Sequence, residues 1–157
     1  MTVRDLSIFA DYHQFYIYDA QMQGTRPEDW TTDDMLRKVI CGGDHLVVFT
    51  ARNMDVPVRV EVLPEAPPLE LFGWDHMVDG ALRTVSGVLL ILGCTDLEEG
   101  AERVVLAPGT YRLRVSMAGL DSLSADGLEG DDKYRVQIWP GPWRETVVRQ
   151  MHEPGTD

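Results

Sequence analysis

The clearest structural signal in the chain is the stretch Tyr-Arg-Leu-Arg-Val-Ser-Met at residues 111–117, in which apolar and polar side chains alternate. Alternation with a period of two places the apolar side chains on one face of a β-strand and the polar ones on the other. The same pattern recurs at 133–139 and at 56–62, where four valines alternate with Pro57 and two charged residues. These three stretches predict strands that are buried on one face.

Shorter runs of β-branched, aromatic and aliphatic residues predict further strands on either side. With the three above, the predicted strands span residues 6–9, 15–18, 46–51, 56–62, 69–72, 74–78, 88–92, 111–117 and 133–139. Residues 52–55 are a short polar connection, which predicts a hairpin between 46–51 and 56–62. The whole pattern predicts an all-β fold, an antiparallel β-sandwich of about eight or nine strands with one short helix.

The single helix is predicted at residues 32–41. Thr31 is a good N-cap residue, and Asp34 stands at the third helical position, where its side chain completes a capping box. Trp30 and Met35 occupy the two positions of a hydrophobic staple. The apolar stripe that follows is narrow, so we expect the helix to pack across one end or face of a sheet.

The chain length of 157 residues favours one domain. The run Pro-Gly-Pro at 140–142 follows the last predicted strand, and the sequence ends in small and polar residues. We therefore expect one sandwich domain at 1–143 and a flexible C-terminal tail at 144–157.

Nothing in the sequence predicts export or membrane insertion. Residues 1–10 lack the basic and apolar regions of a signal peptide, and the longest apolar run, 88–92, is far shorter than the roughly 20 residues of a membrane-spanning helix. We therefore expect a cytoplasmic protein in which Cys41 and Cys94 are reduced thiols, with one disulfide between them as the alternative.

The composition is strongly acidic, with 26 Asp and Glu against 14 Lys and Arg and a net charge of -12. Proteins that bind nucleic acid directly need clustered Lys and Arg to neutralise phosphates, so this class is disfavoured. Basic proteins become the favoured partners, because the negative field of the chain attracts them.

No set of residues has the spacing of an enzyme site or a metal site. The four histidines, His13, His45, His76 and His152, lack the three- to five-residue spacing of zinc ligands. The sequence also has no phosphate-binding loop and no nucleophile elbow. We therefore expect no catalytic residue, no bound metal and no cofactor.

Several short motifs point to a known family. They are Asp11-Tyr12-His13-Gln14-Phe15, Asp29-Trp30-Thr31, Asp44, Phe49 and Arg52-Asn53, with Pro-Gly-Thr-Tyr at 108–111. Together they resemble the ComJ family of competence proteins, which inhibit the DNA-entry nuclease. The resemblance covers residues 6–140 and implies a non-enzymatic protein that binds a nuclease and blocks it. The family-motif residues are Tyr12, His13, Gln14, Phe15, Trp30, Arg52 and Asn53.

The acidic residues suggest how such an inhibitor would work. Nine acidic residues lie between positions 96 and 132, against three arginines. Carboxylates on a rigid scaffold can mimic DNA and compete for the basic cleft of a nuclease. The candidate partner contacts are Asp126, Glu129, Asp131 and Asp132 in one connection and Asp96, Glu98 and Glu99 in another. The alternative is that these residues only keep the domain soluble.

Two other functions remain open. An immunity protein against a toxin nuclease would use the same physics. A carbohydrate- or ligand-binding sandwich would instead use flat aromatic rings, for which Trp74, Trp139 and Trp143 are candidates, although large aromatic side chains are more often buried.

Overall fold

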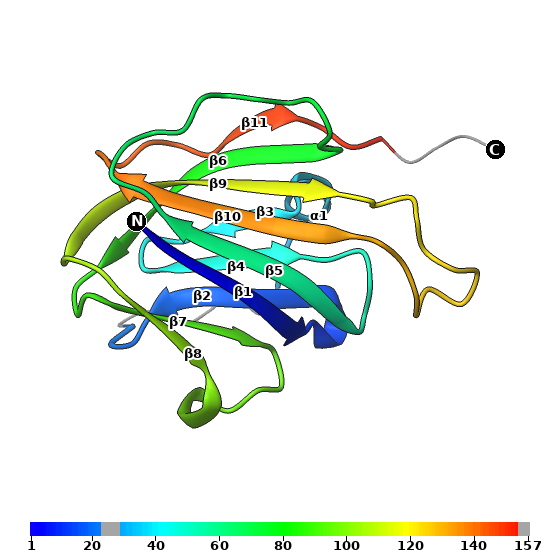
Figure 1. Ribbon diagram of the computed structural model, residues 1–157, viewed down its shortest axis with the longest axis horizontal. Coiled ribbons are helices and arrows are strands. Elements are labelled where there is room, and N and C mark those ends of the chain that lie inside the picture. The colour runs from blue at the N-terminus through cyan, green and yellow to red at the C-terminus, as the bar shows by residue number, and fades with distance from the viewer. Residues whose placement is uncertain (23–28, 154–157) are drawn as a thin grey trace.

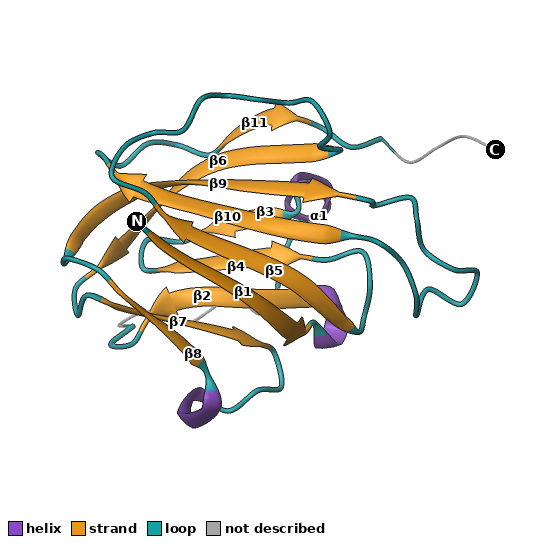
Figure 2. Ribbon diagram, in the orientation of Figure 1, coloured by secondary structure: helices purple, strands orange, loops and turns teal. Residues whose placement is uncertain are grey.

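Within residues 1–22 and 29–153, which the computed structural model describes, eleven strands form two sheets that pack face to face (Figure 1). The strands are β1 (Thr2–Phe9), β2 (Gln14–Asp19), β3 (Val39–Cys41), β4 (His45–Phe49), β5 (Asp55–Val62), β6 (His76–Thr84), β7 (Val88–Gly93), β8 (Glu102–Val105), β9 (Gly109–Ala118), β10 (Lys133–Pro140) and β11 (Val147–Gln150). The helical elements are η1 (Asp11–His13), α1 (Thr32–Arg37) and η2 (Glu98–Gly100), which leaves the fold almost entirely β (Figure 2). The predicted all-β class is confirmed.

The larger sheet has the order β1-β5-β10-β9-β6-β11, and the smaller has the order β3-β4-β2-β7-β8. Neighbouring strands are antiparallel, as predicted, except that β10 runs parallel to β5 with Tyr134 opposite Val58. Pro57 lies near the start of β5, before the ladder with β10 begins, so its missing N–H interrupts no bond there.

The core lies between the two sheets and is built by the predicted alternation. Val56, Val58 and Val60 of β5 are each at most 1% exposed, and Leu113 and Val115 of β9 are fully buried. Each such side chain contributes about 1.5–3 kcal/mol when it leaves water. The alternating strands are therefore the centre of the larger sheet and its main source of stability.

The helix begins where predicted but ends early. Asp34 N donates to Thr31 Oγ1 over 3.1 Å and Thr31 N donates to Asp34 Oδ2 over 3.0 Å, which confirms the capping box. The helix stops at Lys38, whose φ is 65°, and 39–41 forms β3 against β4 instead of a further helical turn. The prediction of a helix to residue 41 is wrong because burial of β-branched Val39 against the sheet outweighs its local helical pattern.

The predicted hairpin between 46–51 and 56–62 is also wrong. β4 belongs to the smaller sheet and β5 to the larger one, so the connection crosses from one sheet to the other. Ala10 N donates to Met54 O over 3.0 Å and Thr50 N donates to His13 O over 2.8 Å, so both ends of this crossing are bound to the η1 segment. A local turn signal cannot tell a hairpin from a crossing when both strands are buried.

The C-terminal part contributes to the sheet. β11 pairs with the edge strand β6, with Val147 opposite Asp79, so the expected flexible tail is wrong for Val147–Gln150 and the domain extends past residue 143. Residues 154–157, the polar end of the expected tail, lie outside the described residues. The predicted strand at 69–72 is a loop, in which Phe72 is 99% exposed.

Two further findings concern membrane-spanning helices and the cysteines. No helix among the described residues is long and apolar enough to cross a membrane. Cys41 and Cys94 form no disulfide, and burial raises the pKa of the Cys41 thiol.

His76 is a fully buried histidine held in its neutral form. Its Nε2 lies 2.7 Å from the carbonyl oxygen of Arg37 and its Nδ1 accepts from His152 N over 2.9 Å, so the ring donates at Nε2 and accepts at Nδ1. Protonation at Nδ1 would break the second bond. Burial, with smaller contributions from Lys38 and His152, lowers the pKa of His76.

Because the folded-state pKa of His76 lies below the unfolded value of about 6.5, only the unfolded state gains a proton as the pH first falls below that value. We expect the melting temperature to drop between pH 7.5 and 5.5, and the His76→Gln variant to show a flatter pH profile. Circular dichroism melts at several pH values measure this. The exposed His13→Gln variant should keep the wild-type slope, and an equal flattening in both variants would contradict the assignment.

Candidate partner-binding end

A mostly apolar groove lies at the end of the sandwich where η1 meets α1. Tyr12 and His13 of η1 line one side and Met35 and Lys38 line the other, around a cavity of about 280 Å³. Trp30 and Phe49 complete it, with their rings edge to face and 5.0 Å apart at the centroids. The groove therefore joins three family-motif residues, Tyr12, His13 and Trp30.

The backbone around this groove is strained. Tyr12, His13 and Lys38 have φ values of 58°, 60° and 65°, and they are the non-glycine residues with positive φ in the part of the chain that the structure describes. Each such residue costs about 1 kcal/mol relative to an ordinary conformation. All three line the groove: Lys38 as the left-handed cap that ends α1, and Tyr12 and His13 as two successive residues of η1.

The groove is flanked by exposed apolar side chains. Tyr12 is 66% exposed, and Met35 and Leu36 on the outer side of α1 are each 57% exposed. Scattered exposed apolar residues are ordinary, but Tyr12 and Met35 line the same groove from two different elements. Aromatic residues and methionine are the residue types enriched at protein–protein interfaces.

Two buried residues of the motif, Gln14 and Phe15, support the groove from inside the domain. The Gln14 side-chain amide donates to Tyr12 O over 3.2 Å, and Tyr16 donates its hydroxyl to Gln14 Oε1 over 2.6 Å. Phe15 is fully buried and packs edge to face on Tyr134 at 6.2 Å. Gln14 and Phe15 therefore hold η1 in place, while Tyr12 and His13 face outward.

A buried polar cluster lies beside the groove and includes Arg52. The Nε of Arg52 donates to Asp132 Oδ1, and the Tyr134 hydroxyl donates to Asp132 Oδ2 over 2.7 Å. Ala51 N in turn donates to the Tyr134 oxygen over 2.7 Å. Burial raises the pKa of Tyr134, so this hydroxyl stays a donor. Asn53 lies next to this cluster, and its Oδ1 is buried with no hydrogen-bond partner.

The cluster corrects one predicted contact residue. Asp132 is fully buried, and both of its oxygens are bonded within the domain, so it is a structural residue and presents no surface to a partner. Asp126, Glu129 and Asp131 are exposed, as a contact surface requires. The sequence does not show that Arg52 pairs with Asp132, so it could not show that Asp132 is a structural residue.

The exposed carboxylates belong to an ordered loop, residues 119–132. Asp126 accepts from Ser124 Oγ over 2.5 Å and from Leu128 N over 3.0 Å, and these bonds lower its pKa. Ser124 N donates to Glu129 O over 2.7 Å, and Asp131 N donates to Ser122 Oγ over 2.7 Å. The loop projects from the end of the larger sheet (Figure 1) with its charges pre-arranged.

The second acidic connection lies elsewhere. Asp96, Glu98 and Glu99 lie in and beside η2, next to the edge strand β8 and apart from the 119–132 loop (Figure 1). All three residues are exposed, and two of them have local partners: Asp96 accepts from Gly93 N over 2.8 Å, and Glu98 accepts from the Tyr18 hydroxyl over 2.6 Å. The structure does not bring the two predicted acidic segments into one surface.

The three tryptophans considered as a sugar-binding platform lie on the outer face of the larger sheet or beside it. A cation stacks on each ring: Arg83 on Trp143 at 4.7 Å, Arg114 on Trp139 at 5.6 Å, and Arg135 on Trp74 at 4.4 Å. They therefore form separate cation–π pairs, and not one bare aromatic surface.

In the described part of the chain, no three His, Cys, Asp or Glu side chains are placed to hold a metal ion together. Both ring nitrogens of His76 already have partners, and His152 Nε2 lies 3.1 Å from Asp121.

Sequence reasoning missed Met35 and Lys38 as groove residues. The pattern assigned Met35 to the buried stripe of the helix, whereas it is exposed because α1 is only six residues long. No sequence signal marks a lysine with positive φ, since Gly or Asn is the usual residue there. A helix that stops at Lys38 was needed to reveal this side of the groove.

The fold and the groove define a class of small β-sandwich proteins with two facing sheets and a short helix. No known family model matches the sequence, and no curated protein matches it. Two solved structures share its fold. One is ComJ from Bacillus subtilis, described as an inhibitor of the DNA degrading activity of NucA, with a TM-score of 0.62 and 16% identity over 88% of this chain and 95% of ComJ.

The other is the product of crocagin biosynthetic gene J, with a TM-score of 0.59 and 18% identity over 90% of this chain and 98% of that one. Both comparisons span nearly the whole of each chain, so the ComJ-like fold predicted from short motifs is confirmed. At these identities the likeness concerns the fold.

The buried cluster predicts that replacing two neighbouring aspartates has very different effects on the stability of the fold. Asp132→Ala leaves Arg52 without its buried partner, and we expect a loss of about 3 kcal/mol in the free energy of unfolding. Asp131→Ala removes an exposed side chain and should leave the unfolding midpoint unchanged. Urea titrations followed by circular dichroism measure both, and equal midpoints would refute the structural role of Asp132.

Proposed function

We propose that this chain is a non-enzymatic inhibitor that binds a nuclease and blocks it. The observation that carries the proposal is that the outward-facing members of the ComJ-like motif, Tyr12, His13 and Trp30, gather in one groove of a ComJ-like fold. ComJ itself is described as inhibiting the DNA degrading activity of NucA. The groove offers the apolar centre that a protein partner would cover.

The acidic loop supplies the second part of the surface. Asp126, Glu129 and Asp131 project at the end of the sandwich that holds the groove, and the loop base is bound there through Asp132 and Arg52. An apolar centre with a charged rim is the usual arrangement of protein interfaces. A nuclease has a positive cleft for phosphates, so carboxylates on the rim would steer its approach and mimic DNA.

Inhibition by this route requires no chemistry from the chain, because a bound inhibitor only has to occupy the cleft. It also requires no cofactor. The partner is expected to be basic, and the two proteins would meet in the cytoplasm, where Cys41 and Cys94 remain thiols.

The direct test is to capture the partner and assay it. The tagged chain is incubated with lysate of its own cells, eluted with salt, and the retained proteins are identified by mass spectrometry. We expect a basic nuclease whose degradation of DNA stops as the purified chain is added. Retention of a nuclease that stays fully active, or of none, would contradict the proposal. A captured toxin nuclease would assign the chain to immunity.

Charge reversal tests the rim. The triple variant Asp126→Lys, Glu129→Lys and Asp131→Lys should slow association with the captured nuclease by about tenfold or more, chiefly through the on-rate. Stopped-flow or surface plasmon resonance measurements at two salt concentrations detect this. The control is Glu99→Lys, an exposed carboxylate of η2, which should change the on-rate little. Equal effects per charge would place the contact elsewhere.

A variant at Tyr12 distinguishes an effect on nuclease binding from an effect on stability. In Tyr12→Gly, the relief of about 1 kcal/mol of positive-φ strain offsets the extra freedom that glycine has in the unfolded chain. We expect an unfolding free energy close to that of the wild type and nuclease affinity weakened by about 30-fold, as for a central interface aromatic. Phe72→Gly removes an aromatic outside the groove that is even more exposed, at 99% against 66%, and is the control. Unchanged affinity in Tyr12→Gly would remove the groove from the interface.

A further inference from the structure

The outer face of the larger sheet is rich in cations, although the chain as a whole carries a net charge of -12. On each strand, the side chains that point away from the core alternate with the buried ones. Seven of the 14 Lys and Arg residues occupy this face: Arg59, Arg83, Arg112, Arg114, Lys133, Arg135 and Arg149. The acidity of the chain is therefore unevenly distributed, and this face favours anions more than the composition implies.

Three of these cations, Arg59, Arg114 and Arg149, have carboxylate partners among the described residues, and the other four do not. Arg114 and Arg149 both donate to Asp79, over 2.7 and 2.9 Å. Lys133 and Arg135 take part in no ion pair with the described residues, and Arg135 Nε is buried with no hydrogen-bond partner. A buried donor on a charged group is costly when it lacks a partner, and a bound water, ion or ligand can supply one.

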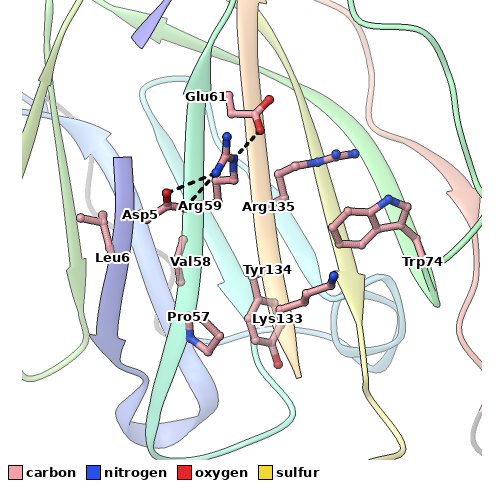
Figure 3. Close-up of a pocket in the computed structure, with 10 residues that line it drawn as sticks. All are labelled: Asp5, Leu6, Pro57, Val58, Arg59, Glu61, Trp74, Lys133, Tyr134 and Arg135. Carbon is pink, nitrogen blue, oxygen red and sulfur yellow. Dashed lines mark hydrogen bonds and ion pairs between the residues drawn. The ribbon is translucent and has the colours of Figure 1, made fainter. Parts of the chain in front are cut away.

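Both cations stand at a cavity of about 490 Å³ between β1, β5, β10 and Trp74 (Figure 3). Arg135 and Lys133 point toward the Trp74 ring, with their charged groups 4.4 and 5.2 Å from its centroid. Opposite them, Leu6 and Pro57 add apolar surface. The volume falls in the range of small-molecule sites, which combine apolar walls with a few polar groups.

The carboxylates of the cavity are already engaged. Arg59 donates to Glu61 over 2.8 Å and to Asp5 over 3.2 Å, and Gln137 donates to Glu61 over 3.1 Å. Burial lowers the pKa of the Arg135 guanidinium, and the charges of Glu61 and Glu70 only partly oppose this. The cavity thus has two cations without close counter-ions and no carboxylate left to accept a cationic ligand.

We infer that this cavity binds a small organic anion, whose carboxylate or phosphate is held by Arg135 and Lys133 while its apolar body rests between Trp74 and Pro57. The guanidinium supplies the planar fork that matches either oxyanion, and the ammonium adds a second charge. Stacking on Trp74 fixes both side chains before the ligand arrives, which lowers the entropic cost of binding.

The test uses three naphthyl compounds that differ only in the attached group: 1-naphthaleneacetate, 1-naphthyl phosphate and the neutral 1-naphthaleneacetamide. Each is titrated into the full chain by isothermal titration calorimetry. Binding is located from the indole N–H resonance of Trp74, assigned with Trp74→Phe. We expect at least one anion to bind about tenfold or more tightly than the amide, as a charge-assisted bond implies, and to shift that resonance. The anion that binds more tightly shows whether the cavity prefers a carboxylate or a phosphate.

Matched variants complete the test. Arg135→Gln and the exposed Lys133→Gln should each weaken anion binding by about tenfold, and Lys133→Gln serves if Arg135→Gln does not fold. Arg83→Gln, which removes a cation stacked on Trp143 on the same face, should leave affinity unchanged. The inference is overturned if no probe binds at millimolar concentration, if the amide binds as well as the anions, or if all three variants behave alike.

Discussion

The buried carboxylate of Asp132 is the constraint on which one end of this molecule depends. A buried carboxylate is costly unless it is paired and hydrogen-bonded, and Asp132 meets this requirement with Arg52 and Tyr134. These partners lie on the segment that crosses between the sheets and on β10. This small cluster therefore joins the base of the acidic loop to the segment that crosses between the sheets. Phe15 packs on Tyr134, so the cluster also contacts β2, the strand that follows η1.

The positions of the charged residues say more about the surface of this molecule than the net charge does. An overall charge of -12 suggests one negative surface. However, the carboxylates of the 119–132 loop lie apart from those in and beside η2 (Figure 1). Half of the Lys and Arg residues lie on the outer face of the larger sheet. Strand alternation causes this, because arginines placed between core residues must all emerge on the same side. The carboxylates of these two loops and the cations of the larger sheet therefore lie on different parts of the surface.

Local strain is concentrated where the surface is most exposed. Tyr12, His13 and Lys38 adopt positive φ on the two sides of one groove. The bonds that hold them are backbone contacts, such as Thr50 N to His13 O, together with the buried amide of Gln14. A segment bound this firmly can present an aromatic side chain without ordering it at the moment of binding, which reduces the entropic cost of an interface.

The sequence by itself determined the all-β class, the alternating strands at 56–62, 111–117 and 133–139, and the capping box of the helix, since each depends on neighbours close in the chain. It also determined the likeness to ComJ through short motifs. Tertiary structure alone decided the sheet crossing after β4, the strand at Val147–Gln150 and the burial of Asp132. Each of these depends on a partner far away in the sequence, and alternation reports which face of a strand is buried but not what covers it.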